Sequence, residues 1–510
     1  MKVIRIHDKW KKSLIIVISI IIFIWSLLCF NIESTGAHTN KTIWEIDRFI
    51  QSKMEKNNIP GAAVAITHNN KVIFTKGYGK TGDNTSVTAK TPFAIASLSK
   101  SFTALAVMQL VEAGKVKLDT PVEDYIPSFK LTDTKGAKIT VRQLLNHTSG
   151  LTDKVYPDMT LNPQPNSLEA VIKRLENVSL AVEPGKEYHY NNPNYQILAR
   201  LVEAVSNEEF STYLENHIFQ PLEMEQTFNV STTMELNQNP EFPSGHYFLF
   251  GIPVAVDEPN WFISGPAGIV SNVNDMAKWL ISQLNGGKYR NEQILSSESI
   301  KSMQTASSPT ISYGMGWNIG KTEDGKKQVQ HSGILWTYKA EEVLLPEQGY
   351  GIVMLFNSGL NAFVDYSSFT SGISKLLSNQ TPNEPFYNSQ MIEMFMVVLI
   401  IITIIIGIRK LKYIKKWEGK YKKRPKWRSI IYLIFSLLPL YILVFLPQLL
   451  TFIGGGRVLN IKGIFLMMPS IIIWLGITSI LSLAIVIRCV IRIPKLKNSS
   501  QISNLKDKLF

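Results

Sequence analysis

The sequence predicts an α/β fold in which an antiparallel sheet is flanked by N- and C-terminal helices and joined to a helical lobe, followed by transmembrane helices. Three observations support it. Strand-like segments lie near both ends of the polar part of the chain, helix-like segments fill the middle, and three long apolar runs come last. Strands at both ends of a helical insertion indicate one domain of two lobes, with a cleft between them where sites are common.

Length and charge narrow the possible classes of protein. The chain has 510 residues, more than one ordinary domain, and a net charge of +13. The positive charge is concentrated in residues 1–12, 409–429 and 488–510, and each of these segments adjoins an apolar run. Residues 409–429 alone contain eleven lysines and arginines against one glutamate. This pattern is typical of membrane topology, so we expect a lipid bilayer as partner and no nucleic acid.

Cysteine usage excludes two further classes. The chain has two cysteines, Cys29 and Cys489, which lie in or beside apolar runs, so a disulfide framework and a thiolate metal site are both excluded. Cys29 is not expected to be lipidated, because Ser26-Leu27-Leu28 lacks a small residue just before it. The sequence contains no glycine-rich phosphate loop and no cluster of metal ligands. We therefore expect no cofactor and no metal.

Residues 1–37 are expected to form a basic cytoplasmic start followed by a signal peptide or an anchor helix. Residues 13–30 are uncharged, apolar and long enough to cross a bilayer. Small residues at Thr35-Gly36-Ala37 would suit cleavage, but the apolar run is long for a signal peptide, so both readings stay open. Both place the following residues outside the cytoplasm.

Residues 38–385 are predicted to form the extracellular domain. Helical spacing of apolar residues begins at Ile43, and two strands, 62–67 and 71–77, follow as a hairpin. The middle is helix-rich. Its apolar faces are Leu168, Val171, Ile172 and Leu175, and then Leu198, Leu201, Val202 and Val205. The last elements expected are strands at 326–330, 338–345 and 351–356 and a helix at 362–377.

A nearly all-apolar helix is predicted from Ser97 to Gly114, and such a helix is a buried one. Ser97 lies in its first turn, and Lys100, three residues on, lies on the same face. A serine hydroxyl becomes a good nucleophile when a neighbouring base takes its proton, and a buried lysine can lose its own proton to become that base. Ser97-x-x-Lys100 therefore predicts an acyl-enzyme site.

Later motifs strengthen the prediction of an acyl-enzyme site, because together with Ser97 and Lys100 they resemble the serine β-lactamase and penicillin-binding protein family. The resemblance is closest to class C β-lactamases, D-alanyl-D-alanine carboxypeptidases and related esterases, and it spans roughly residues 43–377. It implies a β-lactamase/transpeptidase-like fold. The main matches are Ser97-Leu98-Ser99-Lys100, Tyr190-Asn191-Asn192 and His331-Ser332-Gly333. The supporting matches are residues 145–151, Pro266-Ala267-Gly268 followed by Asp275, and Tyr313-Gly314-Met315-Gly316-Trp317.

The resemblance implies a role for each matched residue. Ser97 would be acylated, Lys100 and Tyr190 would share the proton transfers, and which of the two is the base stays open. A phenol near ammonium groups can have a lowered pKa, which we expect for Tyr190. Asn192 would hold substrate and Lys100. His331, Gly333 and Ile334 would form the opposite wall of the cleft. Gly333 would let substrate approach the backbone closely. The N–H groups of Ile334 and Ser97 would form the oxyanion hole.

One position departs from the family pattern. His331 stands where most β-lactamases have the lysine of Lys-Thr-Gly, which faces a substrate carboxylate. A histidine is mostly neutral at pH 7, which disfavours efficient β-lactam hydrolysis and leaves room for peptides or esters. No motif matches the deacylating glutamate of class A enzymes, and His147 is interpreted as structural.

Residues 386–510 are predicted to contain three transmembrane helices, at 391–408, 430–453 and 464–487. The basic loop 409–429 and the basic tail fall in the cytoplasm, and Pro439, Pro447 and Pro469 are expected to kink the helices. We therefore expect a multi-pass cell-membrane protein with an external serine hydrolase domain that acts on D-alanyl peptides, D-amino-acid esters or β-lactams near peptidoglycan or teichoic acid. The alternative is a sensor on the same scaffold with little turnover. The oligomeric state stays open.

Overall fold

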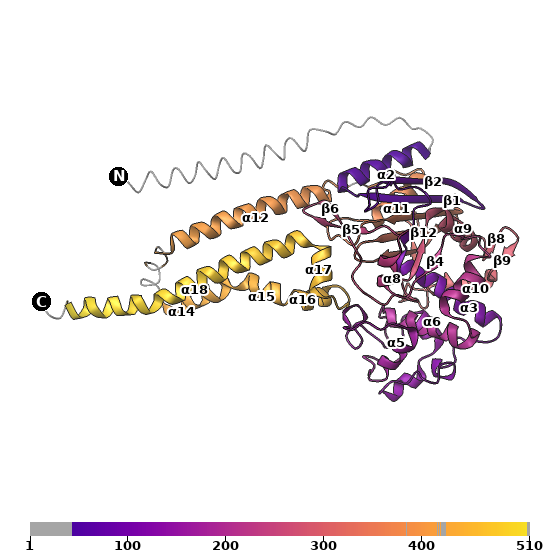
Figure 1. Cartoon of the computed structure of the whole chain (residues 1–510), viewed down its shortest axis with the longest axis horizontal. Coiled ribbons are helices and arrows are strands. Elements are labelled where there is room, and N and C mark those ends of the chain that lie inside the picture. The colour runs from indigo at the N-terminus through magenta and orange to yellow at the C-terminus, as the bar shows by residue number, and fades with distance from the viewer. Residues whose placement is uncertain (1–42, 384, 416, 418, 420–424, 507–510) are drawn as a thin grey trace. The chain divides into compact units, whose positions relative to one another are not determined.

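The computed structural model describes residues 43–506, except 384, 416, 418 and 420–424 (Figure 1). The apolar run at 13–30, predicted as signal peptide or anchor, lies outside the described residues.

A six-stranded antiparallel sheet forms the centre of the domain. Its order is β10 (Asn318–Lys321), β11 (Lys327–Ile334), β12 (Lys339–Leu345), β13 (Tyr350–Phe356), β1 (Gly61–His68) and β2 (Lys71–Gly79). The last strand in sequence, β13, pairs with the first, β1, in a register that places Ala65 opposite Val353. The two ends of the domain therefore meet in the middle of one sheet.

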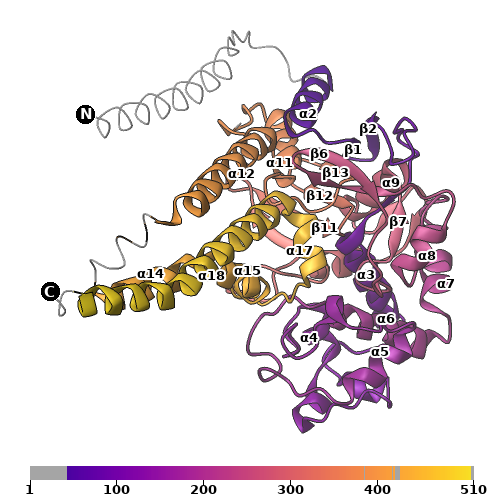
Figure 2. The same cartoon turned by 60° about the vertical axis from the view of Figure 1, so that its left-hand side comes forward.

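Alternation of side chains along the strands gives this sheet two buried faces. Ala62, Val64 and Ile66 pack on the face covered by α2 (Ile43–Asn57) and α11 (Ser367–Leu377). Ala63 and Ala65 point to the other face, against which α9 (Val273–Leu284) packs. Because helices cover both faces (Figure 2), the central strands β1, β12 and β13 are buried at consecutive positions.

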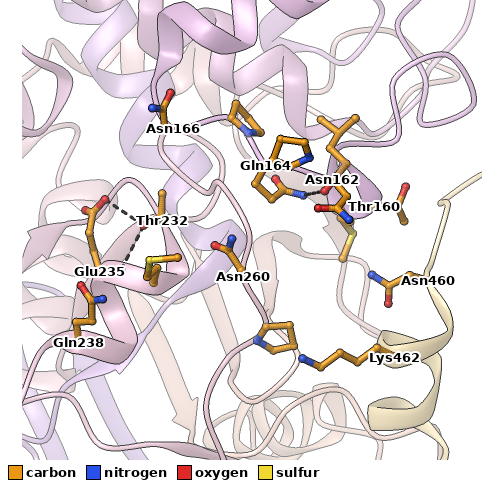
Figure 3. Close-up of a pocket in the computed structure, with 16 residues that line it drawn as sticks. Thr160, Asn162, Gln164, Asn166, Thr232, Glu235, Gln238, Asn260, Asn460 and Lys462 are labelled. Carbon is orange, nitrogen blue, oxygen red and sulfur yellow. Dashed lines mark hydrogen bonds between the residues drawn. The ribbon is translucent and has the colours of Figure 1, made fainter.

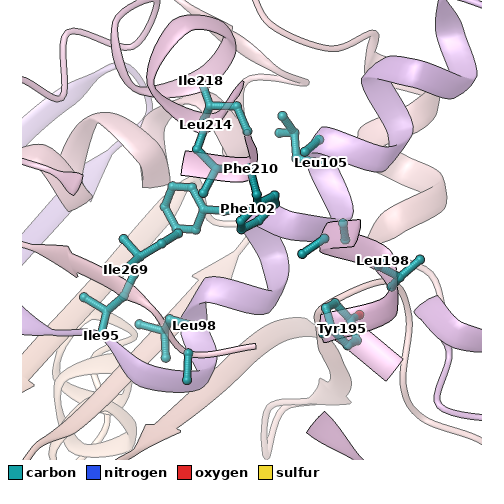
Figure 4. Close-up of a cluster of buried hydrophobic side chains, with 14 of the residues drawn as sticks. Ile95, Leu98, Phe102, Leu105, Tyr195, Leu198, Phe210, Leu214, Ile218 and Ile269 are labelled. Atoms are coloured by element: carbon teal, nitrogen blue, oxygen red, sulfur yellow. The ribbon is translucent and has the colours of Figure 1, made fainter. Parts of the chain in front are cut away.

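The helical lobe is built around α3 (Ser99–Glu112), which packs against α6 (Asn192–Ser206). Figure 4 shows Phe102 and Leu105 of α3 among buried side chains from neighbouring helices. The predicted apolar faces of α5 (Leu168–Leu175) and α6 are buried, with Val205 at the edge of the core. A helix surrounded in this way gains from burial on every side, which explains the absence of a polar face in its sequence.

The remaining elements of the domain are short. They are β3 (Phe93–Ala94), β4 (Phe228–Asn229), β5 (Gly245–Leu249), β6 (Ile252–Val256), β7 (Ile269–Ser271), β8 (Lys288–Tyr289), β9 (Glu292–Gln293), α4 (Val141–Leu145), α7 (Phe210–Leu214), α8 (Thr233–Gln238), α10 (Ser297–Met303) and the helical turns η1 (Ala96–Leu98), η2 (Val122–Asp124), η3 (Thr134–Lys138), η4 (Asp158–Thr160) and η5 (Glu215–Phe219).

The C-terminal apolar runs are helical. Within the described residues, three segments are long and apolar enough to cross a membrane, namely Ser389–Lys412, Lys426–Val444 and Pro469–Ile493. They belong to α12 (Ser389–Lys412), α14 (Lys426–Ser436), α15 (Leu438–Val444) and α18 (Pro469–Lys506), and α18 packs against the other three. Helices α15 and α16 (Leu446–Ile453) begin one residue before a proline.

The run expected at 464–487 is not one helix. A separate short helix, α17 (Ile461–Met467), precedes α18, and the break falls at Met468 because Pro469 cannot donate the N–H that a continuous helix needs. Two contacts tie these helices to the domain. Ser389 N–H donates to Asn57 Oδ1 at 3.2 Å, and Gly463 of α17 packs so closely on Trp336 that an added Cβ would lie 2.3 Å from the indole ring.

Candidate active site

Ser97 lies in the helical turn η1, one turn before α3, and its Oγ is 3.1 Å from Lys100 Nζ. The turn begins at Ala96, whose φ of +50° is unusual for a residue with a side chain. Ser97 is half-buried, whereas Lys100 is completely buried. The predicted pair therefore comes together at the start of the buried helix.

The other contacts of Lys100 hold its amine in place beside Ser97. Nζ donates to Asn192 Oδ1 at 2.9 Å and to the Pro266 carbonyl at 3.1 Å, and both of these oxygens can only accept. A neutral amine has two N–H groups for them and a lone pair left for the Ser97 hydroxyl. Burial lowers the pKa of Lys100 well below 10.5, and the positive charge of Arg457 acts in the same direction. The geometry thus suits a lysine base.

Asn192 holds Lys100, as expected, but both ends of its amide are used by the protein. Its Nδ2 donates to Asp158 Oδ2 at 2.9 Å, while its Oδ1 accepts from Lys100. The carboxylate of Asp158 therefore fixes the orientation of the amide. Asn192 is nine-tenths buried or more, so its visible role is to position the lysine.

Tyr190 lies beside this pair, with its ring centroid 4.8 Å from Lys100 Nζ. Burial raises the pKa of Tyr190 to about 12, although a hydrogen bond with Ser97 and the charge of Arg457 act against this rise. The expected lowering of this pKa is therefore wrong, because desolvation of the phenolate outweighs the nearby positive charge. The phenol keeps its proton at neutral pH.

His331 lies on β11 and is held as a neutral ring. Its Nδ1 is 2.9 Å from the Ser332 carbonyl, which can only accept, so the proton is on Nδ1 and Nε2 accepts from Tyr313 OH at 3.2 Å. Burial lowers the pKa of His331 to about 3. This position therefore carries no cation.

Gly333 and Ile334 end β11 next to the turn that carries Ser97. A Cβ on Gly333 would lie 2.2 Å from the Ile95 carbonyl oxygen, so the glycine lets the strand pack directly on this turn. The close approach is thus to the chain itself, whereas we expected it to be to substrate. Ile334 is 38% exposed at the strand end.

His147 contacts the ring of Tyr190 and the backbone that follows it. Its Nδ1 accepts from Asn191 N–H at 3.2 Å and from Asn194 Nδ2 at 3.0 Å, and its ring centroid is 4.5 Å from that of Tyr190. These contacts fix the position of the Tyr190–Asn191 backbone and ring.

Three charged residues near the site were missed by the sequence motifs: Asp153, Asp158 and Arg457. Arg457 Nη1 lies 3.0 Å from Asp153 Oδ1, and the guanidinium carbon lies 5.9 Å from the centroid of the Tyr190 ring. The two aspartates belong to a loop without a recognisable motif. A signal for Arg457 exists, since it and Lys462 are the two cations in the short stretch 454–463 between two apolar runs.

A cavity of about 840 Å³ adjoins these residues (Figure 3). Its wall runs from Met159, which contacts Arg457, along residues 160–166 to α8, and it is completed by Asn460 and Lys462. Several amide side chains face it, with one amine and one carboxylate. Among the described residues, no group of three or more metal-binding side chains could hold a metal ion.

Comparison with known proteins agrees with this geometry. Residues 46–367 match the family model described as Beta-lactamase. Protein flp of Staphylococcus aureus strain MW2 is 30% identical over 381 residues, 72% of this chain and 73% of that protein. An Escherichia coli K12 protein with the provisional name D-alanyl-D-alanine carboxypeptidase is 28% identical over 54% of this chain and 71% of its own length.

A solved structure, the octameric penicillin-binding protein homologue from Pyrococcus abyssi, superposes with a TM-score of 0.57 at 29% identity. The match covers 67% of this chain and 78% of that one. The predicted resemblance and the predicted fold class are confirmed. The chain belongs to the beta-lactamase family.

Proposed function

We propose that the protein is a membrane-anchored serine hydrolase that forms an acyl-enzyme at Ser97. The observation that carries this proposal is the hydrogen-bond pattern of Lys100. Bonds to two acceptor-only oxygens hold the amine 3.1 Å from Ser97 Oγ, so that in its neutral form it can take the proton of the hydroxyl. A base held in this way makes the hydroxyl a nucleophile.

The steps follow from the groups present. Ser97 Oγ attacks the substrate carbonyl carbon while its proton passes to Lys100 Nζ. The N–H groups of Ser97 and Ile334 stabilise the oxyanion. As the bond to the leaving group breaks, Tyr190 gives its proton to that group and recovers one from the lysine ammonium. Water then attacks the acyl carbon, and the same residues act in the reverse order.

The site favours peptides or esters over β-lactams within the proposed set of D-alanyl peptides, D-amino-acid esters and β-lactams. The neutral His331 offers no charge to a substrate carboxylate. The adjoining cavity offers amide groups that can hydrogen-bond an extended polar substrate, such as a peptidoglycan or teichoic-acid fragment. The relative provisionally named a D-alanyl-D-alanine carboxypeptidase supports the peptide class.

We infer on which side of the membrane the domain lies from which ends of the apolar helices contact it and which ends are basic. The three apolar helices support membrane association. The start of α12 and helix α17 both contact the domain, whereas the basic residues 409–412 lie at the far end of α12, about 36 Å away along its 24 residues. An external domain, residues 38–385, and a multi-pass region, residues 386–510, are consistent with this arrangement.

The test uses the full-length protein in detergent micelles. We expect a fluorescent penicillin and a D-alanyl ester to give an acyl adduct by intact mass, and Ser97→Ala to give none. Ser101→Ala is the matched control, because its hydroxyl only bonds back to the Leu98 carbonyl in the same helix. Equal labelling of wild type and Ser97→Ala would contradict the proposal.

A sensor with slow deacylation is the second candidate. The observation that favours it is the ion pair between Asp153 at the site and Arg457 in the loop between C-terminal helices. The two candidates differ in the lifetime of the adduct. Release of product with every substrate within seconds supports the hydrolase, and an adduct that persists for hours with every substrate supports the sensor.

A further inference from the structure

We propose that Arg457 is a positioning residue of the active site. From the loop between two C-terminal helices it holds Asp153, and through Asp153 the segment Tyr190–Asn192, so that the membrane-associated part of the chain completes the site. This inference rests on the proposed role of Ser97 and adds a residue that lies outside the part of the chain that matches the family model.

The contact between the loop and the site is specific. Arg457 Nη1 donates to Asp153 Oδ1 at 3.0 Å, and the next residue, Val458, donates its backbone N–H to Asp153 Oδ2 at 3.2 Å. Both carboxylate oxygens are therefore held by one loop. Arg457 Nη2 also contacts Met159 Sδ at 3.1 Å. Three contacts to one short segment fix the guanidinium in place.

Asp153 transmits this contact to the catalytic residues. Asn191 Nδ2 donates to Asp153 Oδ1 at 3.2 Å. Asn191 lies between Tyr190, which is bonded to Ser97, and Asn192, which holds Lys100. Asp153 is 97% buried, so without Arg457 its charge would have no compensating ion in direct contact.

The conformation of the loop places Arg457 next to Asp153. Gly455 and Gly456 have φ values of +70° and +92°, which residues with side chains rarely adopt. On the other side of Arg457, helix α17 is anchored by the packing of Gly463 on Trp336. The backbone N–H groups of Trp336 and Thr337 donate to the buried carboxylate of Glu258 at 2.9 and 2.8 Å. The loop is thus held at both ends.

Because Arg457 is charged, replacing it should shift the pKa values of its neighbours, which the loss of a packing contact alone would not do. Burial raises the pKa of Asp153 to about 7, and Arg457 opposes that rise. Removing one positive charge from a set of coupled groups raises the proton affinity of the whole set, and removing one negative charge lowers it. The titratable or charged groups around Lys100 and Asp153 are His147, Asp158, Tyr190, Tyr195, His331 and Arg457.

The experiment measures the rate constant of acylation by fluorescent penicillin against pH, with full-length protein in detergent micelles. Acylation needs a neutral Lys100, so the rate rises with pH through a midpoint that the charges of Asp153 and Arg457 move in opposite directions. For Arg457→Ala we expect this midpoint to rise by about one pH unit, the usual effect of one nearby charge. For Asp153→Asn we expect it to fall, and for Arg457→Lys to stay near wild type.

Arg142→Ala is the matched control, because it removes an arginine from an exposed arginine–aspartate pair, with Asp119 at 2.7 Å, on the surface of the helical lobe. It should leave the midpoint unchanged. An equal loss of rate at every pH in Arg457→Ala and Asp153→Asn, with no shift of the midpoint, would overturn the inference. If Arg457→Ala fails to fold, the fall of the midpoint expected for Asp153→Asn and the unchanged midpoint expected for Arg457→Lys still decide. Absence of an acyl adduct in wild type with both the fluorescent penicillin and the D-alanyl ester would instead refute the proposed function.

Discussion

At the scale of single residues, Lys100 shows how the site differs from the surrounding core. It is a completely buried amine with a pKa well below its ordinary value. The unfolded chain binds a proton there up to about pH 10.5, whereas the folded chain loses it at a lower pH. Between the pKa values of the folded and the unfolded chain, the contribution of Lys100 to the free energy of unfolding therefore rises with pH. The protein accepts this cost because a neutral amine is the form that can take the serine proton.

Tyr190 carries the first prediction at this scale. Because its pKa is raised to about 12, we expect no decline of the acylation rate of wild type between pH 8 and 10. Tyr190→Phe should lower the acylation rate constant by roughly 10²-fold, the usual contribution of a positioned proton donor. Stopped-flow fluorescence with a labelled penicillin measures both quantities.

Tyr188→Phe is the control for this experiment, since Tyr188 also lies near His147 but is 37% exposed. It should leave the rate close to that of wild type. A decline centred between pH 8 and 9 in wild type that vanishes in Tyr190→Phe would indicate a phenolate base and would contradict the assignment to Lys100.

Some of these residues were predictable from sequence and others were not. Ser97 and Lys100 are three positions apart in one helical segment, so local periodicity was enough to pair them. Asp153 and Arg457 are 304 positions apart, and neither belongs to a motif. Their contact depends on how α17 docks on the domain, which no local pattern encodes. The pKa of Tyr190 was misjudged for the same reason, because burial is a property of the fold.

At the scale of elements, periodicity located most helices and strands, and the errors have physical causes. Strand β11 runs to Ile334, whereas the sequence predicts an end at Gln330, because His331 and Ser332 look like turn residues yet pair with Glu342 and Glu341 of β12. Helix α11 begins at Ser367, five residues later than predicted from residue 362. Asp365 accepts from the backbone N–H of Ser368 there and so competes with an earlier start.

The end of β11 carries the prediction at this scale. Gly333→Ala would place a methyl group 2.2 Å from the Ile95 carbonyl, so the strand must move away from the turn that carries Ser97. We expect the acylation rate to fall at least tenfold and the free energy of unfolding to fall by about 1–3 kcal/mol. Acylation kinetics and thermal unfolding give the two values.

Gly320→Ala is the matched substitution in the edge strand β10, where an added Cβ has no heavy atom within 4 Å among the described residues. It should change neither quantity by much. If Gly333→Ala acylated as fast as wild type, the tight packing of β11 on η1 would not be what holds the site together.

At the scale of the whole molecule, the sequence showed that apolar helices follow the domain but not how they are joined to it. The stretch 379–390 is polar, which is typical of a linker, yet its end is hydrogen-bonded to α2 through Ser389 and Gln390. The run predicted at 464–487 divides into α17, which contacts the domain, and α18. Polar composition predicts exposure, and it cannot predict a specific backbone contact with another helix.

The topology carries the third prediction. In a variant without Cys29 and Cys489, single cysteines are placed at two exposed positions, by Asn383→Cys next to the domain and by Lys415→Cys beyond α12. With intact cells, a membrane-impermeant maleimide should label position 383 and should label 415 only after permeabilisation, because basic segments remain in the cytoplasm. Equal labelling of both positions before permeabilisation would contradict an external domain.

The attachments between helices and domain, among them those at Asn57 and at Trp336, have a mechanical consequence. A domain joined to membrane helices at one point could rotate freely, but attachment at points on different elements leaves it little rotational freedom. If the helices cross a bilayer, the mouth of the cleft stays at one height and one tilt above the lipid. Candidate substrates are then sorted by where they reside, and those immobilised at that level meet the serine far more often than those drifting in the medium.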